Sequence, residues 1–254
     1  MKRLYSIIIL ILFFSNILLS STISDKKNIK ILNIINHQRM LSQKITKDYL
    51  YAKNKINIYE ANQEISRSLK DFNSSYQQVN NLTKNKKIKK AMYFVKNSSI
   101  KFSTLSNQPL NEKNMKSILN LSESILSQTE QIISLLKKDI HNNNSKFIIK
   151  SGQQEMLAQR IAKYYIAYQS NKNENSKINM KKNIELFAKN HEQIMRYKGN
   201  NHTIRKKIKE IDKSWSIAKN FYVKIEESGD FPITVFETTN NITQKMNDII
   251  KQIK

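Results

Sequence analysis

The side chains best suited to hold a small polar ligand lie in a segment that the chain carries twice. The first copy reads NHQRMLSQKITKDYL at residues 36–50, and the second reads GQQEMLAQRIAKYYI at residues 152–166. Between residues 38 and 49, seven of twelve positions are identical in the two copies, and they include glutamines and lysines. Core packing alone would not fix glutamines and lysines. The repeat therefore indicates a specific polar contact or a binding site.

On a helix with about 100° between successive residues, the first copy has two distinct faces. One is an apolar stripe that would face a bundle core, formed by Ile31, Ile34, Leu41, Ile45, Tyr49 and Ala52. The other surrounds Arg39 and mixes polar with long apolar side chains: Asn36, Met40, Gln43, Lys47 and Leu50. Such a face suits a helix that meets a second copy of itself and holds a polar group between them. A solvated face with stray apolar residues explains it equally well, so both interpretations stay open.

The first copy resembles the helix that marks the PilJ/NarX-type sensor domain, an extracytoplasmic helical bundle of nitrate-responsive histidine kinases and type IV pilus chemoreceptors. The family segment reads approximately G-R-Q-R-M-L-S-Q-R-I-A-K. Residues 37–47, HQRMLSQKITK, match it in register, and residues 153–163, QQEMLAQRIAK, match it with fewer polar identities. The remainder of each repeat resembles the family in helical plan and length only.

The resemblance implies a nitrate or nitrite sensor in which the arginine after the glutamine binds the anion near a two-fold helix interface. Arg39 occupies that position. A guanidinium suits this task because its parallel N–H groups match a flat oxyanion and it stays charged at any relevant pH. Gln43, Lys44, Lys47 and His37 would supply further donors or charge nearby. Such a sensor would act as a homodimer or with a separate membrane partner, a histidine kinase or chemoreceptor of signal transduction and chemotaxis.

Three positions depart from the family pattern. Asn36 replaces its glycine, His37 replaces its first arginine, and Glu155 stands in the second copy where the first has Arg39, although Gly152 is retained. Because a carboxylate repels an anion, the second copy is predicted to keep the architecture without the anion site. One hypothesis pairs the repeats within one chain, with Arg39 opposite Glu155 as an ion pair. End-to-end stacking of the repeats, with dimerisation between chains, is the alternative.

The elements that position these residues are predicted to be helices alone. Three glycines and two prolines in 254 residues leave too few turns for a sheet protein, which needs one roughly every 8 to 12 residues. Clusters of Asn, Gly, Pro and Ser break the chain at residues 54–57, 80–87, 106–111, 141–145, 170–176, 197–201 and 228–232. Seven breaks predict eight helices. The repeat predicts two tandem four-helix up-down bundles, residues 25–143 and 144–254, the second degenerate.

The first 24 residues have the order of a secretory signal peptide: Met-Lys-Arg, an apolar run, then small residues. The apolar run is shorter than the roughly 20 residues that span a bilayer, so a cleaved signal is favoured over a permanent anchor. The chain has no cysteine for a lipid anchor or a disulfide. A periplasmic protein is therefore expected.

Composition and motifs argue against several classes of function. The net charge of +24 suggests nucleic acid in a cytosolic protein, but export weakens that interpretation and no nucleic-acid partner is expected. Biased composition on solvated helix faces explains the lysines, with attraction to small anions or anionic membranes as the alternative. No catalytic or phosphate-binding motif, haem motif or metal-ligand spacing of the four histidines is present, so neither an enzyme nor a cofactor or metal is expected.

The leading expectation is thus an exported sensor-type protein that binds nitrate, nitrite or a similar oxyanion through the first copy of the repeated segment. The alternative is a helical adaptor or structural protein of the cell envelope that kept the bundle without the ligand. A basic protein that binds nucleic acid or membrane forms a third class, which predicts steep salt dependence and indifference to nitrate.

Overall fold

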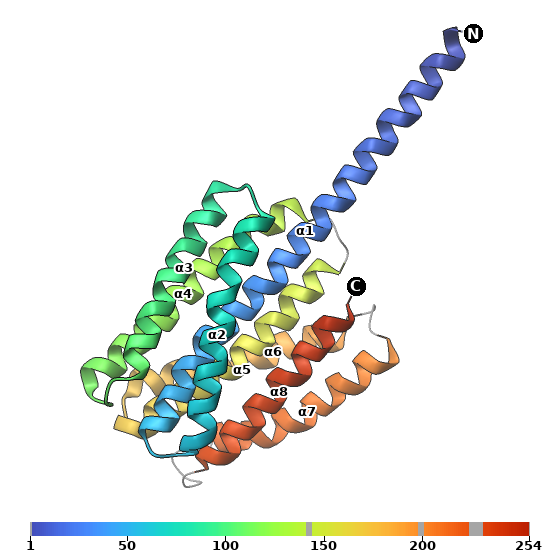
Figure 1. Cartoon of the computed structure of the whole chain (residues 1–254). Coiled ribbons are helices and arrows are strands. Elements are labelled where there is room, and N and C mark those ends of the chain that lie inside the picture. Colours follow the sequence, from blue (N-terminus) through green and yellow to red (C-terminus); the bar gives the residue numbers. More distant parts are fainter. Residues whose placement is uncertain (1, 141–143, 198–200, 224–230, 254) are drawn as a thin grey trace.

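The prediction of a purely helical chain is confirmed. The computed structural model describes the backbone of residues 2–140, 144–197, 201–223 and 231–253, and the side chains within those ranges from residue 24 onward except that of residue 223. Over these ranges the chain forms eight helices and no strand: α1 (Lys2–Lys53), α2 (Ile58–Leu82), α3 (Lys86–Ser106), α4 (Glu112–Asp139), α5 (Ser145–Asn171), α6 (Glu174–Met195), α7 (His202–Val223) and α8 (Pro232–Gln252) (Figure 1).

Asparagines in the predicted breaks start several of these helices. A side-chain oxygen that accepts a backbone N–H at a helix N-terminus satisfies a donor that the helix itself leaves free. Such caps are made by Asn85, Asn111, Asn173 and Asn201. The breaks predicted at 54–57, 80–87, 106–111 and 170–176 coincide with helix ends. Those at 141–145, 197–201 and 228–232 overlap residues outside the described ranges.

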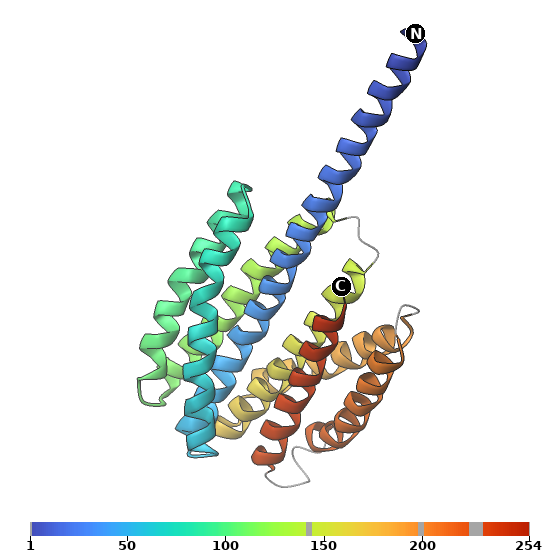
Figure 2. The same cartoon turned by 45° about the vertical axis from the view of Figure 1, so that its right-hand side comes forward.

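Each half of the chain packs its four helices in the same cyclic order. In the first half α1 contacts α2 and α4, and α3 contacts α2 and α4; in the second half α5 contacts α6 and α8, and α7 contacts α6 and α8. The two sets lie side by side and meet mainly where α1 packs on α5 (Figure 2). Buried apolar residues of both sets form one continuous core across this contact. The division into two domains at residue 143 stays a prediction, and the shared core is an argument against independent folding.

The N-terminal part of α1 extends beyond the packed helices (Figure 1). The predicted signal peptide, residues 1–24, lies almost entirely outside the residues whose side chains are described, so it stays a prediction. Among the residues that the structure does describe, no helix is both long and apolar enough to cross a membrane.

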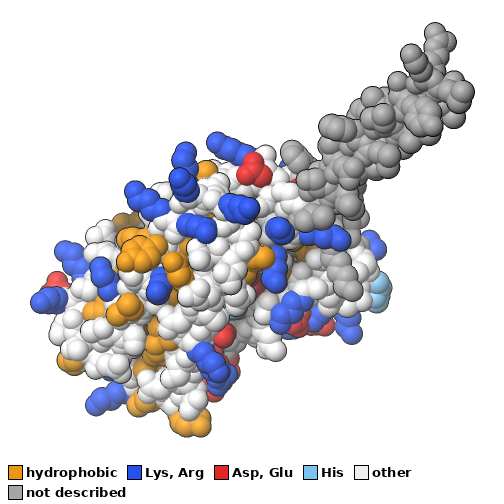
Figure 3. Space-filling model, turned by 45° about the horizontal axis from the view of Figure 1, so that its top comes forward, with side chains coloured by type: hydrophobic (Ala, Val, Ile, Leu, Met, Phe, Trp, Pro, Cys, Tyr) orange, Lys and Arg blue, Asp and Glu red, His pale blue; other side chains and the backbone are white. Residues whose placement is uncertain are grey.

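On the face drawn in Figure 3, basic side chains are spread out rather than gathered in one place. Lysines and arginines alternate there with uncharged side chains over the whole width of the bundles. The net charge therefore acts as a general positive field on this face and does not by itself mark a binding site.

Candidate functional site at the contact of the repeated helices

The two copies of the repeated segment pack against each other along α1 and α5. Asn36 Nδ2 donates to the Ile148 carbonyl at 3.1 Å, Lys163 Nζ donates to Gln43 Oε1 at 2.7 Å, and, farther along, Asn54 Nδ2 donates to Ser170 Oγ at 2.7 Å. These bonds join residues 112, 120 and 116 positions apart, close to the repeat itself. The helices therefore run parallel and nearly in register, and the repeats pair within one chain.

This pairing decides between the two interpretations of the mixed face of the first copy. Asn36, Met40, Gln43, Lys47 and Leu50 are all buried. The solvated-face interpretation is wrong because α5 and its neighbours cover these side chains. The face is an interface between the two copies, and the partner is supplied by the same chain. That it holds a polar ligand stays a prediction.

Gly152 sets the distance between the two helices. A Cβ built at this position would come within 2.6 Å of the Asn36 Cβ, which no real pair of side chains tolerates. Asn36 and Gly152 are equivalent positions of the repeat, so the helices approach where each residue faces its counterpart, as in an isologous contact. The close approach that the family glycine suggests is kept, but only one of the two positions is a glycine.

Arg39 is buried at the junction of α1, α4 and α5, with 1% of its surface exposed. Its Nη1 atom lies 2.7 Å from Glu130 Oε1, and its Nη2 atom donates to the Ile149 carbonyl at 3.0 Å. Its Nε–H has no partner among the described groups. Burial lowers the pKa of Arg39, and the Glu130 carboxylate opposes this shift. The guanidinium is thus already neutralised and partly hydrogen-bonded by the protein.

Glu155, the counterpart of Arg39, is 2% exposed, and its Oε1 atom has no partner among the described groups. Burial raises its pKa to about 8, although the charges of Arg39 and Lys251 work against this shift. The predicted ion pair is therefore wrong in its partner: Arg39 pairs with Glu130 on α4, and Glu155 acts on Arg39 only through a longer-range attraction. With its pKa raised, the Glu155 carboxyl carries less negative charge near pH 7, so its attraction to Arg39 is weak there.

Gln43 belongs to a buried network that ties the halves together. Its Nε2 atom donates to the Ser122 carbonyl at 3.1 Å, and its Oε1 atom accepts from Lys163. Lys163 Nζ also lies 2.6 Å from Glu123 Oε1, and Arg160 holds the other oxygen of that carboxylate at 2.6 Å. Burial lowers the pKa of Lys163 to about 8, with Glu123 opposing. Gln43 is therefore occupied by protein partners on both sides of its amide.

Lys47 and Lys44 are also paired within the chain. Lys47 Nζ donates to Asn240 Oδ1 at 2.7 Å and lies 3.1 Å from Asp48 Oδ1, and burial lowers its pKa to about 8. Lys44 Nζ lies 2.8 Å from both Asp48 and Glu64. Burial lowers the pKa of Lys44, but these two carboxylates outweigh it and leave the pKa above its ordinary value. Neither ammonium group is free to receive an anion.

His37 lies apart from the other predicted site residues. Its side chain is 36% exposed, and its Nε2 atom is 3.9 Å from Asp71 Oδ2. Burial lowers its pKa, and the Asp71 charge opposes this. With Glu155 and Lys251 it borders an open depression of about 560 Å³ between α1, α2, α5 and α8, which polar and apolar side chains line in equal measure. No three His, Asp or Glu side chains within the described part of the chain lie close enough to bind a metal ion together.

The five predicted site residues do not converge on one point. At a rise of about 1.5 Å per residue, His37 and Lys47 are separated by about 15 Å along α1, several times the width of a nitrate ion. The chemistry that the arrangement supports is internal: buried cations are compensated by carboxylates of α1, α2 and α4 and by an amide of α8. The compensating residues Asp48, Glu64, Glu130, Glu123 and Asn240 were not foreseen from the sequence.

Comparison with models of protein families, with curated proteins and with solved structures found no match. The resemblance of residues 37–47 to the PilJ/NarX-type sensor helix therefore stays a proposal.

Proposed function

We propose that this protein is a non-enzymatic helical adaptor of the cell envelope, in which the repeated helices join two halves of one chain. One observation carries the proposal: the central cation, Arg39, is buried and already paired with Glu130 at 2.7 Å. An anion at this point would displace that carboxylate or lie beside it, and like charges in a buried site repel strongly. The residues that would bind a ligand in a sensor serve here to hold helices together.

The periplasmic location in this proposal rests on the sequence of residues 1–24 alone. N-terminal sequencing of the protein recovered from a periplasmic extract tests it. A mature N-terminus within a few residues of Ser24 supports export with cleavage, and recovery of the intact chain from the cytosol contradicts it.

A small-oxyanion sensor for nitrate or nitrite, which signals through a membrane histidine kinase or chemoreceptor, is the second candidate. It is favoured by two details of the same pair. The Nε–H of Arg39 lacks a partner, and the Glu130 side chain is 46% exposed, so its carboxylate can turn into solvent without breaking the core. An anion would then replace Glu130 on the guanidinium.

The experiment that separates the two candidates uses the purified protein and the variant Glu130→Gln. Nitrate, nitrite, sulfate and chloride are titrated while unfolding is followed by the fluorescence of Trp215, the single tryptophan, which is buried and stacked on Phe187. A specific ligand at about 100 times its dissociation constant stabilises a fold by about 2.7 kcal/mol. The adaptor proposal expects no response beyond that of chloride in either protein.

The variant sharpens this test because it removes the carboxylate that competes for Arg39. If nitrate or nitrite binds at the guanidinium, Glu130→Gln must raise its affinity, and Arg39→Ala must abolish the response. A selective response with this pattern establishes the sensor and removes the adaptor proposal.

A further inference from the structure

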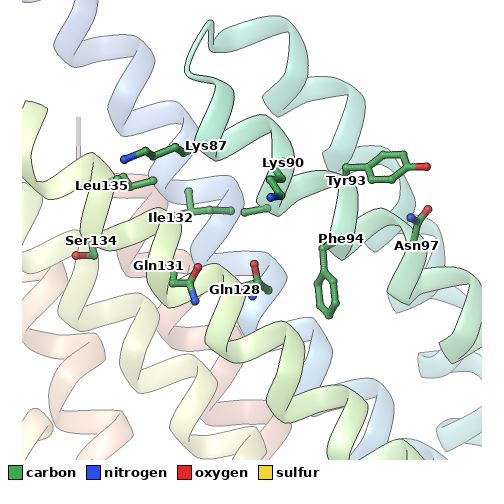
Figure 4. A pocket seen from close by; sticks show the side chains of 11 residues that line it. Lys87, Lys90, Tyr93, Phe94, Asn97, Gln128, Gln131, Ile132, Ser134 and Leu135 are labelled. Atoms are coloured by element: carbon green, nitrogen blue, oxygen red, sulfur yellow. The ribbon is translucent and has the colours of Figure 1, made fainter.

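A groove of about 840 Å³ runs between α3 and α4 on the outer side of the first half. Its α3 wall consists of Lys87, Lys90, Ala91, Tyr93, Phe94 and Asn97, and its α4 wall of Gln128, Gln131, Ile132, Ser134 and Leu135. Figure 4 shows these side chains on the two helices, with Lys87 and Lys90 toward one end and Phe94 toward the other. We call this the α3–α4 groove. Residues 87 and 97 are about 15 Å apart along α3, or nearly three helical turns.

The groove presents apolar surface that the fold leaves uncovered. Ile132 and Ala91 are buried at its base, whereas Phe94 is 40% exposed and the neighbouring Tyr93 57%. Exposed aromatic side chains beside a concave apolar surface are typical of protein-binding sites, because their burial by a partner releases a large apolar area from water.

The second half shows that this surface is not a requirement of the architecture. The positions of α7 that lie 116 residues after Ala91 and Phe94 are Lys207 and Glu210. The buried positions of α4 recur in α8 after 117 residues, so the counterparts of Gln128 and Gln131 are Lys245 and Asp248. There Lys207 Nζ lies 2.9 Å from Asp248 Oδ2, and Glu210 Oε2 lies 3.0 Å from Lys245 Nζ, so ion pairs bridge α7 and α8. Ion pairs thus bridge this helix pair in the second half, whereas in the first half Ala91 and Phe94 lie beside Gln131 and Gln128 and form none.

The charge of the groove is one-sided. No acidic side chain lines it, and neither Lys87 nor Lys90 forms an ion pair within the described part of the chain. Lys137 and Lys138 are exposed at the end of α4, which in an up-down arrangement lies beside the start of α3. An occupant with apolar groups for the base and carboxylates for this basic end would complement the groove.

From this complementarity we infer that the α3–α4 groove binds an acidic amphipathic helix of a partner protein. A helix laid along the groove would set apolar side chains on Phe94 and Leu135 and carboxylates near Lys87 and Lys90. The amides of Asn97, Gln128 and Gln131 on the rim suit the polar flanks of a helix. A flat membrane surface fits less well, since the apolar base is concave. This inference names the partner class of the proposed adaptor and rests on that proposal.

The test measures binding of a fluorescein-labelled synthetic peptide of about five helical turns, with leucines at helical positions i, i+3, i+4 and i+7 and glutamates on the flanks. Its controls are a scrambled peptide of the same composition and the variant Lys181→Glu/Lys182→Glu, which makes the same charge change on exposed lysines of α6. Anisotropy at physiological salt is expected to show micromolar binding of the amphipathic peptide. Phe94→Glu and Lys87→Glu/Lys90→Glu should each weaken it at least tenfold, whereas the α6 variant should weaken it less than threefold.

Three results would overturn the inference. The first is that the amphipathic peptide does not bind at 100 µM. The second is that the scrambled peptide binds as tightly as the amphipathic one, or that the α6 variant weakens binding as much as the groove variants do, which would show attraction by the overall charge. The third is that Phe94→Glu weakens the binding of phosphatidylglycerol vesicles but not that of the peptide. Because Phe94 is partly exposed, Phe94→Glu should keep the melting temperature of the wild type.

The same variants separate this inference from the proposed function. A selective nitrate response that persists in Phe94→Glu would remove the adaptor proposal, whatever the peptide does. Failure of the peptide without a nitrate response would remove the groove as a helix-binding site and leave the proposal of an adaptor standing.

Discussion

The variant Glu155→Gln is expected to stabilise the protein at neutral pH, although it removes a carboxyl group from the neighbourhood of the Arg39 guanidinium. The Glu155 side chain is 2% exposed, with no partner for Oε1 among the described groups, and burial raises its pKa from 4.5 to about 8 against the opposing charges of Arg39 and Lys251. Glutamine has nearly the same shape and carries no charge to desolvate.

The size of the effect follows from proton linkage. An unfolded carboxyl ionises above pH 4.5, but the buried one stays protonated up to about pH 8, so the folded state binds more protons in this window. The contribution of the protonated Glu155 to the free energy of unfolding is therefore fully present below pH 4.5 and is lost as the pH rises toward 8. At about 1.4 kcal/mol per pH unit, the loss is about 3 kcal/mol at pH 7 and roughly 5 kcal/mol above pH 8. Glu155→Gln should avoid this loss.

Urea unfolding of the wild type and the variant at pH 5, 7 and 8.5, followed by Trp215 fluorescence, measures the difference directly. The gain should be below about 1 kcal/mol at pH 5 and reach about 3 kcal/mol at pH 7. Taking the difference cancels the titrations of Lys47 and Lys163 near pH 8. Glu130→Gln is the matched control, with an expected effect of opposite sign, because it leaves Arg39 without its carboxylate. It should lower the free energy of unfolding by about 1 to 3 kcal/mol, which is less than the loss expected for a fully buried carboxylate.

A gain that does not change with pH, or a loss of stability in Glu155→Gln at pH 7, would refute this reasoning. A gain that does not change with pH would mean that burial does not raise the pKa of Glu155. A loss would mean that Glu155 is ionised and bound to Arg39, as one of the two hypotheses from the sequence has it.

Two further substitutions probe the contact of the halves. Gly152→Ala should destabilise by about 1 to 3 kcal/mol because the new Cβ would lie 2.6 Å from the Asn36 Cβ. Adding Asn36→Gly removes that Cβ and should restore part of the loss; thermal unfolding of the single and double variants checks this, and a fully additive loss in the double variant would contradict it. Burial raises the pKa of Glu123, but Lys163 and Arg160 outweigh it and hold the pKa below 4.5, so its contribution is present above pH 4.5 and lost on acidification. Glu123→Gln should cost about 2 to 3 kcal/mol at pH 7 and progressively less below pH 4.5, as measured by urea unfolding; a constant cost would show that packing, not charge, holds the site.

The fold could be predicted because its determinants are local. Scarce glycine and proline exclude a sheet, and asparagines such as Asn85 and Asn173 cap the helices that follow the predicted breaks. The helical period also placed Arg39 and Gln43 on the face opposite the stripe of Leu41. All of these inferences need only neighbouring residues of the chain.

The candidate site could not be predicted because its partners are distant in sequence. A helical projection gives the direction of Arg39 but not the residue that it meets, and Glu130 lies 91 positions away. One signal was available: Glu123 accepts from Lys163 and Asn240 from the equivalent Lys47, and these two acceptors lie 117 positions apart, the spacing of equivalent residues in α4 and α8. Pairing the polar residues of α4 and α8 by the repeat would have suggested that the lysines have internal partners.

Placing both repeats in one chain explains why Glu155 can stand where the first copy has Arg39. In a symmetric homodimer the helix face of Arg39 would meet its own copy, so two arginines would share the interface and two Asn36 side chains would occupy the close approach. Within one chain the copies can differ: Gly152 makes room for Asn36, and Glu155 keeps a second cation away from Arg39. Because α5 already covers this face of α1, a homodimer through it would require the halves to separate and expose the continuous core. The asymmetry of the repeat therefore favours a permanent internal contact over an interface that opens to admit a ligand.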